Sequence, residues 1–226
     1  MKNICFIFLL ISTLICCYVG KGLAADWNKA PECVLQAATD SLAGYLRKIP
    51  PEDAAMYGFS SAASLNQVMA DPAFGFPLLL RTITPAALDS YTDKMTVANL
   101  LSDMKLWYVP VLVEQAAVAF LVVEQSDEFP CKAVSFGYAN LAAEYEAVLA
   151  NLSAAKRRKA VLVVVYQAGE SFIAFPDDDP DNLYSLRMNG MQPKQGSNGS
   201  ENSLQAVVSR LKPVVHQNLK QAKEWK

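Results

Sequence analysis

The stretch Leu106–Glu124, which reads LWYVPVLVEQAAVAFLVVE, decides the fold class. Two apolar runs rich in β-branched residues flank a short polar break at Glu114–Gln115, and this pattern predicts a β-hairpin. The predicted strands, near Leu106–Val113 and Ala117–Glu124, are apolar enough to lie at the centre of a sheet. Pro110 cannot donate a ladder hydrogen bond. We therefore expect it at an edge, in a bulge, or with its missing N–H directed away from the neighbouring strand.

Outward from this hairpin, hydrophobic periodicity predicts further strands and helices. Strands are expected at Leu78–Ile83, Pro130–Phe136, Lys159–Tyr166, Ser171–Phe175 and Leu183–Met188. Helices are expected at Trp27–Ile49, Ser61–Ala70, Thr84 to about Tyr91–Asp93, Tyr138–Ala155, and from Ser203 onward. The segment Lys94–Met104 favours a loop with some extended character, and Pro213 should kink or split the last helix.

These elements predict an α+β fold. Its core is one mostly antiparallel central sheet of about five to seven strands, packed by N-terminal, middle and C-terminal helices. Four segments are expected: a signal peptide at 1–24, a single α+β domain at 25–188, a flexible linker at 189–203 rich in Gly, Ser, Asn and Gln, and a C-terminal amphipathic helix at 204–226. A second apolar hairpin matches the first at an offset of 52 residues, with Val111 on Val163 and Phe120 on Phe172. The match indicates either a duplication or the common use of Val and Phe in buried hairpins.

The first residues have the design of a secretory signal peptide. A short basic start precedes an almost continuously apolar run at Ile4–Val19, and small residues suit cleavage near Ala24 or Ala25. The run is short for a membrane span, which needs about 20 residues. A retained anchor and a lipid-modified Cys16 or Cys17 remain as alternatives. We expect a secreted or periplasmic protein of bacterial type, with no transmembrane segment in the mature chain.

Composition limits the function classes. The chain has 226 residues, 52% of them hydrophobic and 19% charged, and a formal net charge of −2. Residues 1–24 hold Lys2 and Lys21 and no acid, so their removal takes the net charge to −4. A mildly acidic chain without a basic stripe does not fit nucleic-acid binding. The basic run Lys156–Lys159 is interpreted as a solvated helix end favoured by the helix dipole.

After cleavage the chain keeps two cysteines, Cys33 and Cys131. In an oxidising compartment two thiols favour one disulfide, which would tie the N-terminal helix to the edge of the sheet. The alternative is two buried, inert cysteines. A catalytic role for Cys33 is disfavoured because no Cys-x-x-Cys motif or partner histidine accompanies it.

Chemistry-bearing motifs are sparse. His216 is the one histidine of the sequence, so a histidine-based zinc site is excluded, and no Gly-rich phosphate loop is present. Asp177, Asp179 and Asp181 have the alternate spacing of the first ligands of a calcium loop. Asn182 stands where glycine is expected, however, and Met188 where the glutamate is expected. The acidic segment is interpreted as a solvated turn, with a weak metal site or a carboxylate pair as alternatives. No cofactor is expected.

Aromatic residues give the candidate ligand site. Trp107 and Tyr108 at the start of the hairpin, with Phe76 and Tyr57, could line a hydrophobic groove. The alternative is that they fill the interface between sheet and helices.

Three short motifs carry a resemblance: Tyr57-Gly58-Phe59, Phe76-Pro77, and Trp107-Tyr108-Val109-Pro110-Val111. Over Tyr57–Leu152 the chain resembles uncharacterised secreted bacterial α+β domains in which a Trp-x-x-Pro-Val strand opens a small sheet. The resemblance implies no activity and no catalytic residues.

The sequence favours a non-enzymatic, exported domain that binds an envelope protein, a peptide or an apolar small ligand. The alternatives are an envelope enzyme or enzyme inhibitor without a recognisable motif, and a structural envelope component whose C-terminal helix docks elsewhere.

Overall fold

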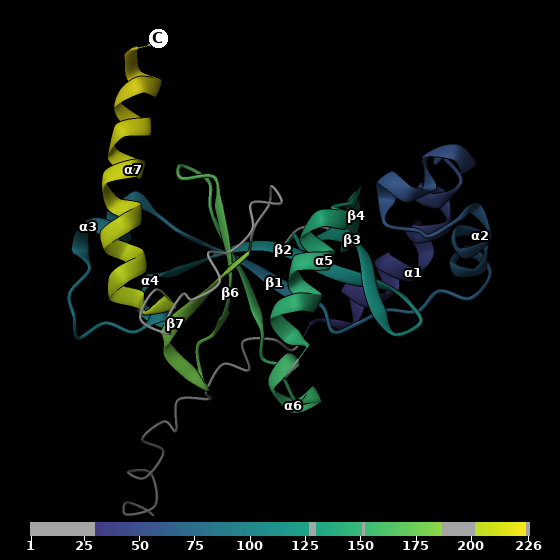
Figure 1. Cartoon of the computed structure of the whole chain (residues 1–226), viewed down its shortest axis with the longest axis horizontal. Coiled ribbons are helices and arrows are strands. Elements are labelled where there is room, and N and C mark those ends of the chain that lie inside the picture. The colour runs from purple at the N-terminus through teal and green to yellow at the C-terminus, as the bar shows by residue number, and fades with distance from the viewer. Residues whose placement is uncertain (1–29, 127–129, 151, 187–201, 225–226) are drawn as a thin grey trace, which may run out of the picture.

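The computed structural model describes residues 30–126, 130–150, 152–186 and 202–224. Within them, seven strands form one sheet in the order β4-β3-β2-β1-β5-β6-β7. Strands β1 and β5 pair in parallel, and the other neighbouring strands pair antiparallel. Helices lie on both sides of this sheet (Figure 1), so the predicted α+β class is confirmed.

The elements have the following bounds. The strands are β1 Leu78–Ile83, β2 Leu101–Val113, β3 Ala116–Glu124, β4 Lys132–Gly137, β5 Val161–Val165, β6 Glu170–Phe175 and β7 Asp179–Leu186. The helices are α1 Glu32–Leu46, η1 Pro51–Tyr57, α2 Ala62–Ala70, α3 Pro85–Ser90, α4 Val97–Leu100, α5 Ala139–Leu149, α6 Ala154–Arg157 and α7 Leu204–Glu224. Side chains cap the starts of α2 and α3: Ser61 accepts a hydrogen bond from Ser64 N–H, and Thr84 accepts one from Ala87 N–H.

The organising hairpin is β2–β3. Its two-residue loop, Glu114 and Gln115, has positive φ at both positions (50° and 69°), the conformation that matches the twist of paired strands. Pro110 lies opposite Phe120 in the ladder, and its carbonyl accepts a hydrogen bond from Gly75 N–H at 2.9 Å. Because N–H and C=O of one strand residue point to the same side, the missing N–H of Pro110 faces away from β3.

Alternation along the central strands divides the core between two faces of the sheet. On β1, Leu78 and Leu80 pack against α5, whereas Leu79 and Ile83 face the opposite side. On β5, Leu162 likewise packs against α5. Both central strands are therefore covered on both faces, which explains their continuous apolar sequences.

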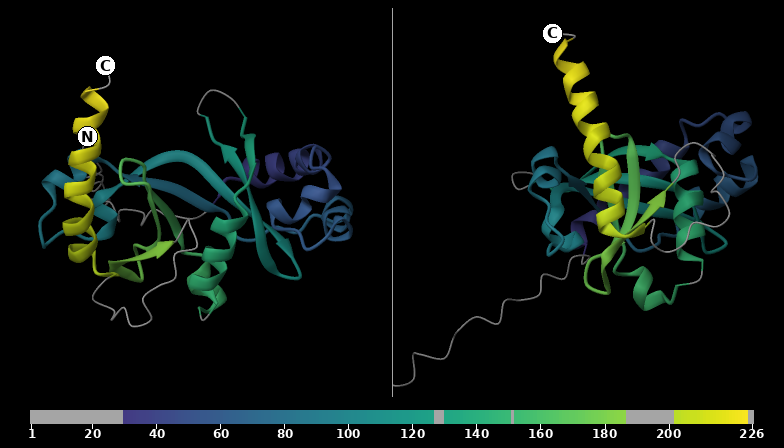
Figure 2. Two further views of the ribbon diagram at one scale, coloured as in Figure 1. Left: turned by 45° about the horizontal axis from the view of Figure 1, so that its top comes forward. Right: turned by 60° about the vertical axis from the view of Figure 1, so that its left-hand side comes forward.

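The face opposite α5 carries two separate groups of helices (Figures 1 and 2). Helices α1 and α2 cover β2, β3 and β4 at one end, around Trp107, Val109 and Leu121. Helices α3, α4 and α7 cover β5, β6 and β7 at the other end, around Val163 and Phe172. Strand β1 contributes to both groups.

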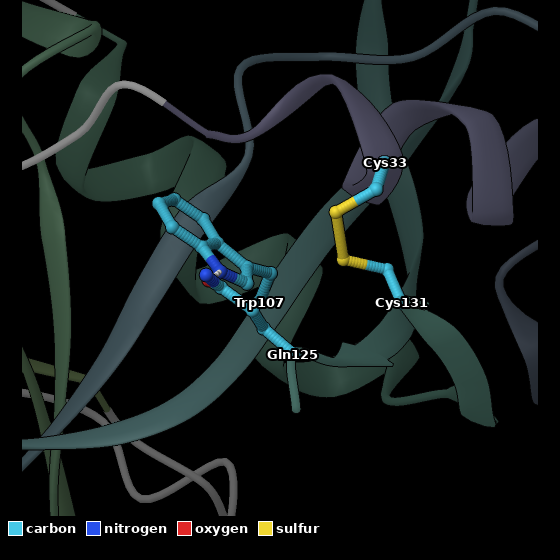
Figure 3. The surroundings of a disulfide bond; sticks show 4 residues. All are labelled: Cys33, Trp107, Gln125 and Cys131. Carbon is cyan, nitrogen blue, oxygen red and sulfur yellow. Dashed lines mark hydrogen bonds between the residues drawn. A yellow bond between two sulfur atoms is a disulfide. The ribbon is translucent and has the colours of Figure 1, made fainter. Parts of the chain in front are cut away.

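The predicted disulfide is confirmed. Cys33, in the first turn of α1, is bonded to Cys131, which directly precedes β4 (Figure 3). The bond ties the N-terminal helix to an edge strand, as expected, and joins residues 98 positions apart. Cys131 packs against the same core cluster that contains Trp107.

Several predicted elements differ from the structure. Lys94–Met104 contains α4 and the first residues of β2 instead of a loop, and the helix expected at Tyr138–Ala155 is divided into α5 and α6. Strand β7 begins at Asp179, inside the predicted acidic turn. Helix α7 continues through Pro213 as one helix. Pro213 and Ser209, the residue four positions before it, are both exposed, so water can satisfy the carbonyl that loses its partner.

The matched hairpins differ in geometry. Phe120 packs against α5, whereas Phe172 packs with α7 on the other face of the sheet. The second hairpin also has a four-residue loop closed by Gly169 at φ 65°. The predicted signal peptide and most of the predicted linker lie outside the described residues.

Candidate functional site

The four aromatic residues predicted to line a ligand site do not lie together. Trp107 and Tyr108 are neighbours on β2 and therefore face opposite sides of the sheet. Trp107 is only 4% exposed in the core under α1, and its indole N–H donates to Gln125 Oε1 at 2.9 Å (Figure 3). Tyr57 stacks on Phe136 in the same core. A ligand role for these residues stays a prediction.

Phe76 lies beneath a basic side chain. The Arg158 guanidinium stands 4.6 Å from its ring centroid, a cation–π geometry. The run Lys156–Lys159 lies at the end of α6, where a basic helix end was expected from the sequence; Arg158 and Lys159 are exposed, and all four side chains also make contacts. Its other contacts are Lys156 over the Phe175 ring, Arg157 near Glu146 and donating to the Leu152 carbonyl, and Lys159 paired with Asp178.

The acidic segment is built into the start of β7. Asp179 accepts hydrogen bonds from Asn182 Nδ2 at 2.7 Å and from the Tyr184 hydroxyl. Asp178 pairs with Lys159 at 2.6 Å, while Asp177 and Asp181 are exposed. Within the part of the chain that the structure describes, no three His, Cys, Asp or Glu side chains gather as a metal site would require. The sequence-based metal hypothesis gains no support from this arrangement.

His216 lies on the outer side of α7. Its Nε2 is 2.9 Å from Asp89 Oδ1 of α3, and Lys212, one turn earlier, is 3.5 Å from the same oxygen. All three side chains are about half exposed, so these contacts link two helices at the protein surface. The side chain that His216 contacts here is a carboxylate and not a nucleophilic hydroxyl or thiol.

A surface that the sequence did not indicate is formed by three tyrosines from three elements. Tyr108 lies on β2, Tyr138 immediately precedes α5, and Tyr166 immediately follows β5. The ring centroids of Tyr108 and Tyr138 are 5.5 Å apart, with the ring planes inclined at 59°. We call these three residues the tyrosine surface.

Local backbone conformation sets the position of Tyr138. Gly137 has φ 132° and Tyr138 has φ 63°, so the chain turns sharply between β4 and α5. Positive φ is uncommon for a bulky residue and marks a position that the surrounding structure fixes. Ser135 Oγ lies 3.2 Å from the Tyr138 hydroxyl, which further orients the ring across the sheet.

The tyrosine surface is partly open to solvent. Tyr138 is 41% exposed and Tyr166 53% exposed, whereas Tyr108 is half-buried beneath them. Burial, and then the neighbouring Tyr138 and Tyr166, raises the pKa of Tyr108; burial and then Tyr138 likewise raises the pKa of Tyr166. The hydroxyls of Tyr108 and Tyr166 therefore stay protonated at neutral pH, and they supply hydrogen bonds and ring faces rather than charge.

A cavity of about 270 Å³ adjoins Tyr138. It lies over the first turn of α5 and is lined by Met56, Tyr138, Ala139, Asn140 and Leu141. Met56, from η1, is 77% exposed and forms an apolar wall. The cavity and the tyrosine surface together offer ring stacking, hydroxyl and amide hydrogen bonds, and one apolar recess. Ring faces, hydrogen-bonding groups and an apolar recess are the kinds of groups that recognise ligands in protein binding sites.

Sequence reasoning identified Tyr108 and missed Tyr138 and Tyr166. Tyr166 continues the alternation of β5, whose even-numbered residues Leu162 and Val164 face α5. From the sequence, that alternation could have predicted that Tyr166 lies on the same face of the sheet as α5. The position of Tyr138 depends on the sharp turn at Gly137, which no periodicity predicts.

The fold and site define a class: an α+β domain whose N-terminal helix is bonded by a disulfide to the start of an edge strand, with a partly exposed tyrosine surface beside its middle helix. Comparison of the chain with protein-family models, with curated proteins and with solved structures finds no match. Among the described residues, no helix has the length and apolar character needed to cross a membrane. The disulfide and this finding are compatible with a secreted or periplasmic protein.

Proposed function

We propose that this chain is a secreted or periplasmic, non-enzymatic domain that binds a partner protein through the tyrosine surface. The observation that carries the proposal is the meeting of Tyr108, Tyr138 and Tyr166 on a partly open part of the sheet. Tyrosine is enriched at protein interfaces because it offers a large apolar ring, a polar tip and few rotatable bonds.

The adjoining cavity favours a protein partner over a free small ligand. Sites for small molecules usually enclose roughly 300–1,000 Å³. At about 270 Å³, the recess beside Tyr138 suits one apolar side chain of a partner anchored on the neighbouring rings.

Partner binding by strand addition is disfavoured because both edges of the sheet are obstructed. On β4, the Tyr45 hydroxyl donates to the Ala133 carbonyl at 3.2 Å, and a register shift interrupts the ladder. On β7, Pro180 and Asp181 lie on the strand, and Asn182 forms a bridge with Ser203. Such features block pairing with another chain, so the partner must use a side-chain surface.

The proposal can be tested with a double variant, Tyr138→Asn plus Tyr166→Ala. Asparagine tolerates the positive φ of position 138, so the change removes the ring without adding backbone strain. The matched control is Val214→Ala, which trims a 36% exposed apolar side chain on α7. Circular dichroism should show that all three proteins are folded.

Wild type and the Val214→Ala control are used as baits in an envelope extract, and a protein that co-purifies with both is isolated. Its affinity for the wild type and for each variant is then measured by titration calorimetry. We expect the purified partner to bind wild type and Val214→Ala alike. The double variant should bind at least tenfold more weakly, about 1.4 kcal/mol. Equal affinity of the partner for the folded double variant would refute the proposed surface.

A further inference from the structure

The Cys33–Cys131 bond lies at the surface and joins two element ends. Cys33 lies in the first turn of α1 and is exposed. Cys131 is the residue that directly precedes β4, and it is half-buried (Figure 3). Thiol–disulfide exchange requires that an attacking thiolate can reach a sulfur of the bond, so access is one of its requirements. This bond meets it in the folded protein.

A cavity of about 520 Å³ reaches one of the two sulfur-bearing residues. Its described lining residues are Glu124, Ser126, Pro130, Cys131 and Lys132; Cys33 does not line it. The volume lies within the range typical of small-molecule sites. The cavity therefore gives a small thiol a place to approach Cys131 from the side of the sheet, whereas Cys33 belongs to the opposing helix.

The position of Cys33 suits the leaving group of an exchange reaction. It is the second residue of α1, a helix of 15 residues whose N-cap, Pro31, supplies no side-chain hydrogen bond. The positive end of a helix stabilises a thiolate in its first turn, and a better-stabilised thiolate leaves faster. Glu32 in the same turn opposes this effect, but it is exposed and its charge is screened by solvent.

We propose that Cys131 is an exchange site for small anionic thiols. The thiolate of such a molecule attacks Cys131 Sγ, the Cys33–Cys131 bond breaks, and a mixed disulfide forms on Cys131. Cys33 leaves as a thiolate and takes a proton from water. A second thiol can then attack the mixed disulfide, which releases the oxidised small molecule and leaves Cys131 reduced.

The fold does not need to open for this reaction. Helix α1 keeps four fully buried side chains on the sheet: Val34, Ala38, Leu42 and Leu46. The Tyr45–Ala133 hydrogen bond also joins the helix to β4 independently of the sulfurs. Exchange should therefore proceed in the native state and loosen only the first turn of α1.

Glutathione serves as the probe. The folded protein is incubated with reduced glutathione, quenched with iodoacetamide, and digested for peptide mass spectrometry. We expect glutathione on Cys131 and the alkyl group on Cys33, formed at a rate that low denaturant does not change. Glutathione on Cys33, or reaction only at denaturant concentrations that unfold the protein, would overturn the proposal.

Two charge variants at the cavity provide a further measure. Lys132→Gln removes the cation that attracts the anionic probe, and Glu124→Gln removes the opposing carboxylate. We expect the exchange rate to fall about two- to fivefold in the first variant and to rise by a similar factor in the second. Both changes at once should return it near the wild-type rate. Unchanged rates in both single variants would place the attack outside this cavity.

Discussion

Gly58 occupies a position where the backbone conformation and a close contact both require glycine. It follows η1 with φ 89°, and a Cβ atom there would lie 2.1 Å from the backbone oxygen of Val118. Because both the conformation and the contact exclude a side chain, glycine lets the η1 segment approach β3 closely. Gly44, in contrast, is an exposed helical glycine of α1 with no atom near the Cβ position.

Replacement of these two glycines by alanine should have opposite effects. Gly58→Ala should destabilise the protein by at least about 1–3 kcal/mol, since positive φ is strained and the backbone must shift. Gly44→Ala should stabilise it by up to about 1 kcal/mol through helix propensity. Urea denaturation measures both changes. A Gly58→Ala variant with the stability of the wild type would show instead that the loop can move away from β3.

The Tyr184 hydroxyl gives a second residue-scale prediction, on alkaline stability. Burial, the hydrogen bond to Asp179 and the charge of that carboxylate raise the pKa of Tyr184 to about 12. Between pH 10 and 12 the unfolded chain loses this proton while the folded protein keeps it. The contribution to stability is therefore complete below pH 10 and is lost as the pH rises toward 12.

Denaturation midpoints measured from pH 9 to 11.5 test this expectation. The midpoint of the wild type should fall with pH, and the fall should be shallower in Tyr184→Phe, which has no phenolic proton to lose there. Parallel pH profiles of the two proteins would contradict it.

At the element scale, α7 is the clearest case of a segment whose role depends on packing. Five of its residues are buried against β5, β6, β7 and α3: Leu204, Val207, Val208, Leu211 and Val215. Its polar contacts, such as the pairing of Lys212 and His216 with Asp89, are exposed and contribute little. The helix is thus held by its apolar stripe.

Leu211→Ala should therefore cost about 2–5 kcal/mol, whereas Val214→Ala, on the exposed side of the same helix, should change stability by less than about 0.5 kcal/mol. Removal of all residues after Asn189 should abolish cooperative thermal melting, because it exposes the apolar side of β5 and β6. A truncated chain that still melts cooperatively would instead support a structural component whose C-terminal helix docks elsewhere.

Elements with strong local patterns were predictable from the sequence. The strand Leu78–Ile83 and the hairpin loop at Glu114–Gln115 have the predicted positions. Strand β2 begins five residues earlier than the predicted Leu106, since its first part pairs with β1 through a register shift that breaks the alternation. The sequence of that part therefore lacks a strand period, and tertiary pairing decides its conformation.

The candidate site was less predictable than the fold. Tyr108 was identified from sequence, but its partners come from two other elements, and their meeting depends on the pairing of β2 with β1 and of β1 with β5. Order along a sheet is a tertiary property. Trp107 is a buried core residue, and from the sequence it could not be distinguished from an aromatic residue that contacts a ligand.

At the scale of the whole molecule, two groups of helices cover one face of the sheet, and the protein could therefore unfold as one cooperative unit or as two. The cluster under α1 and the cluster under α7 are distinct, but β1 contributes to both through Leu79 and Ile83, and β2 contributes to both through Trp107 and Leu101. The α5 cluster on the other face spans both halves, from Ala117 to Ile173. This continuous layer favours a single cooperative unit.

A double-mutant cycle tests this view. Leu42 in the α1 cluster and Leu211 in the α7 cluster are both fully buried, and each change to alanine should cost about 2–5 kcal/mol. Because the two sites share no cluster, the costs should add within about 0.5 kcal/mol. Each single variant should still melt in one transition by calorimetry, with the whole enthalpy moved to lower temperature. Two separated transitions in either variant would show instead that the halves unfold independently and that the α5 layer does not couple them.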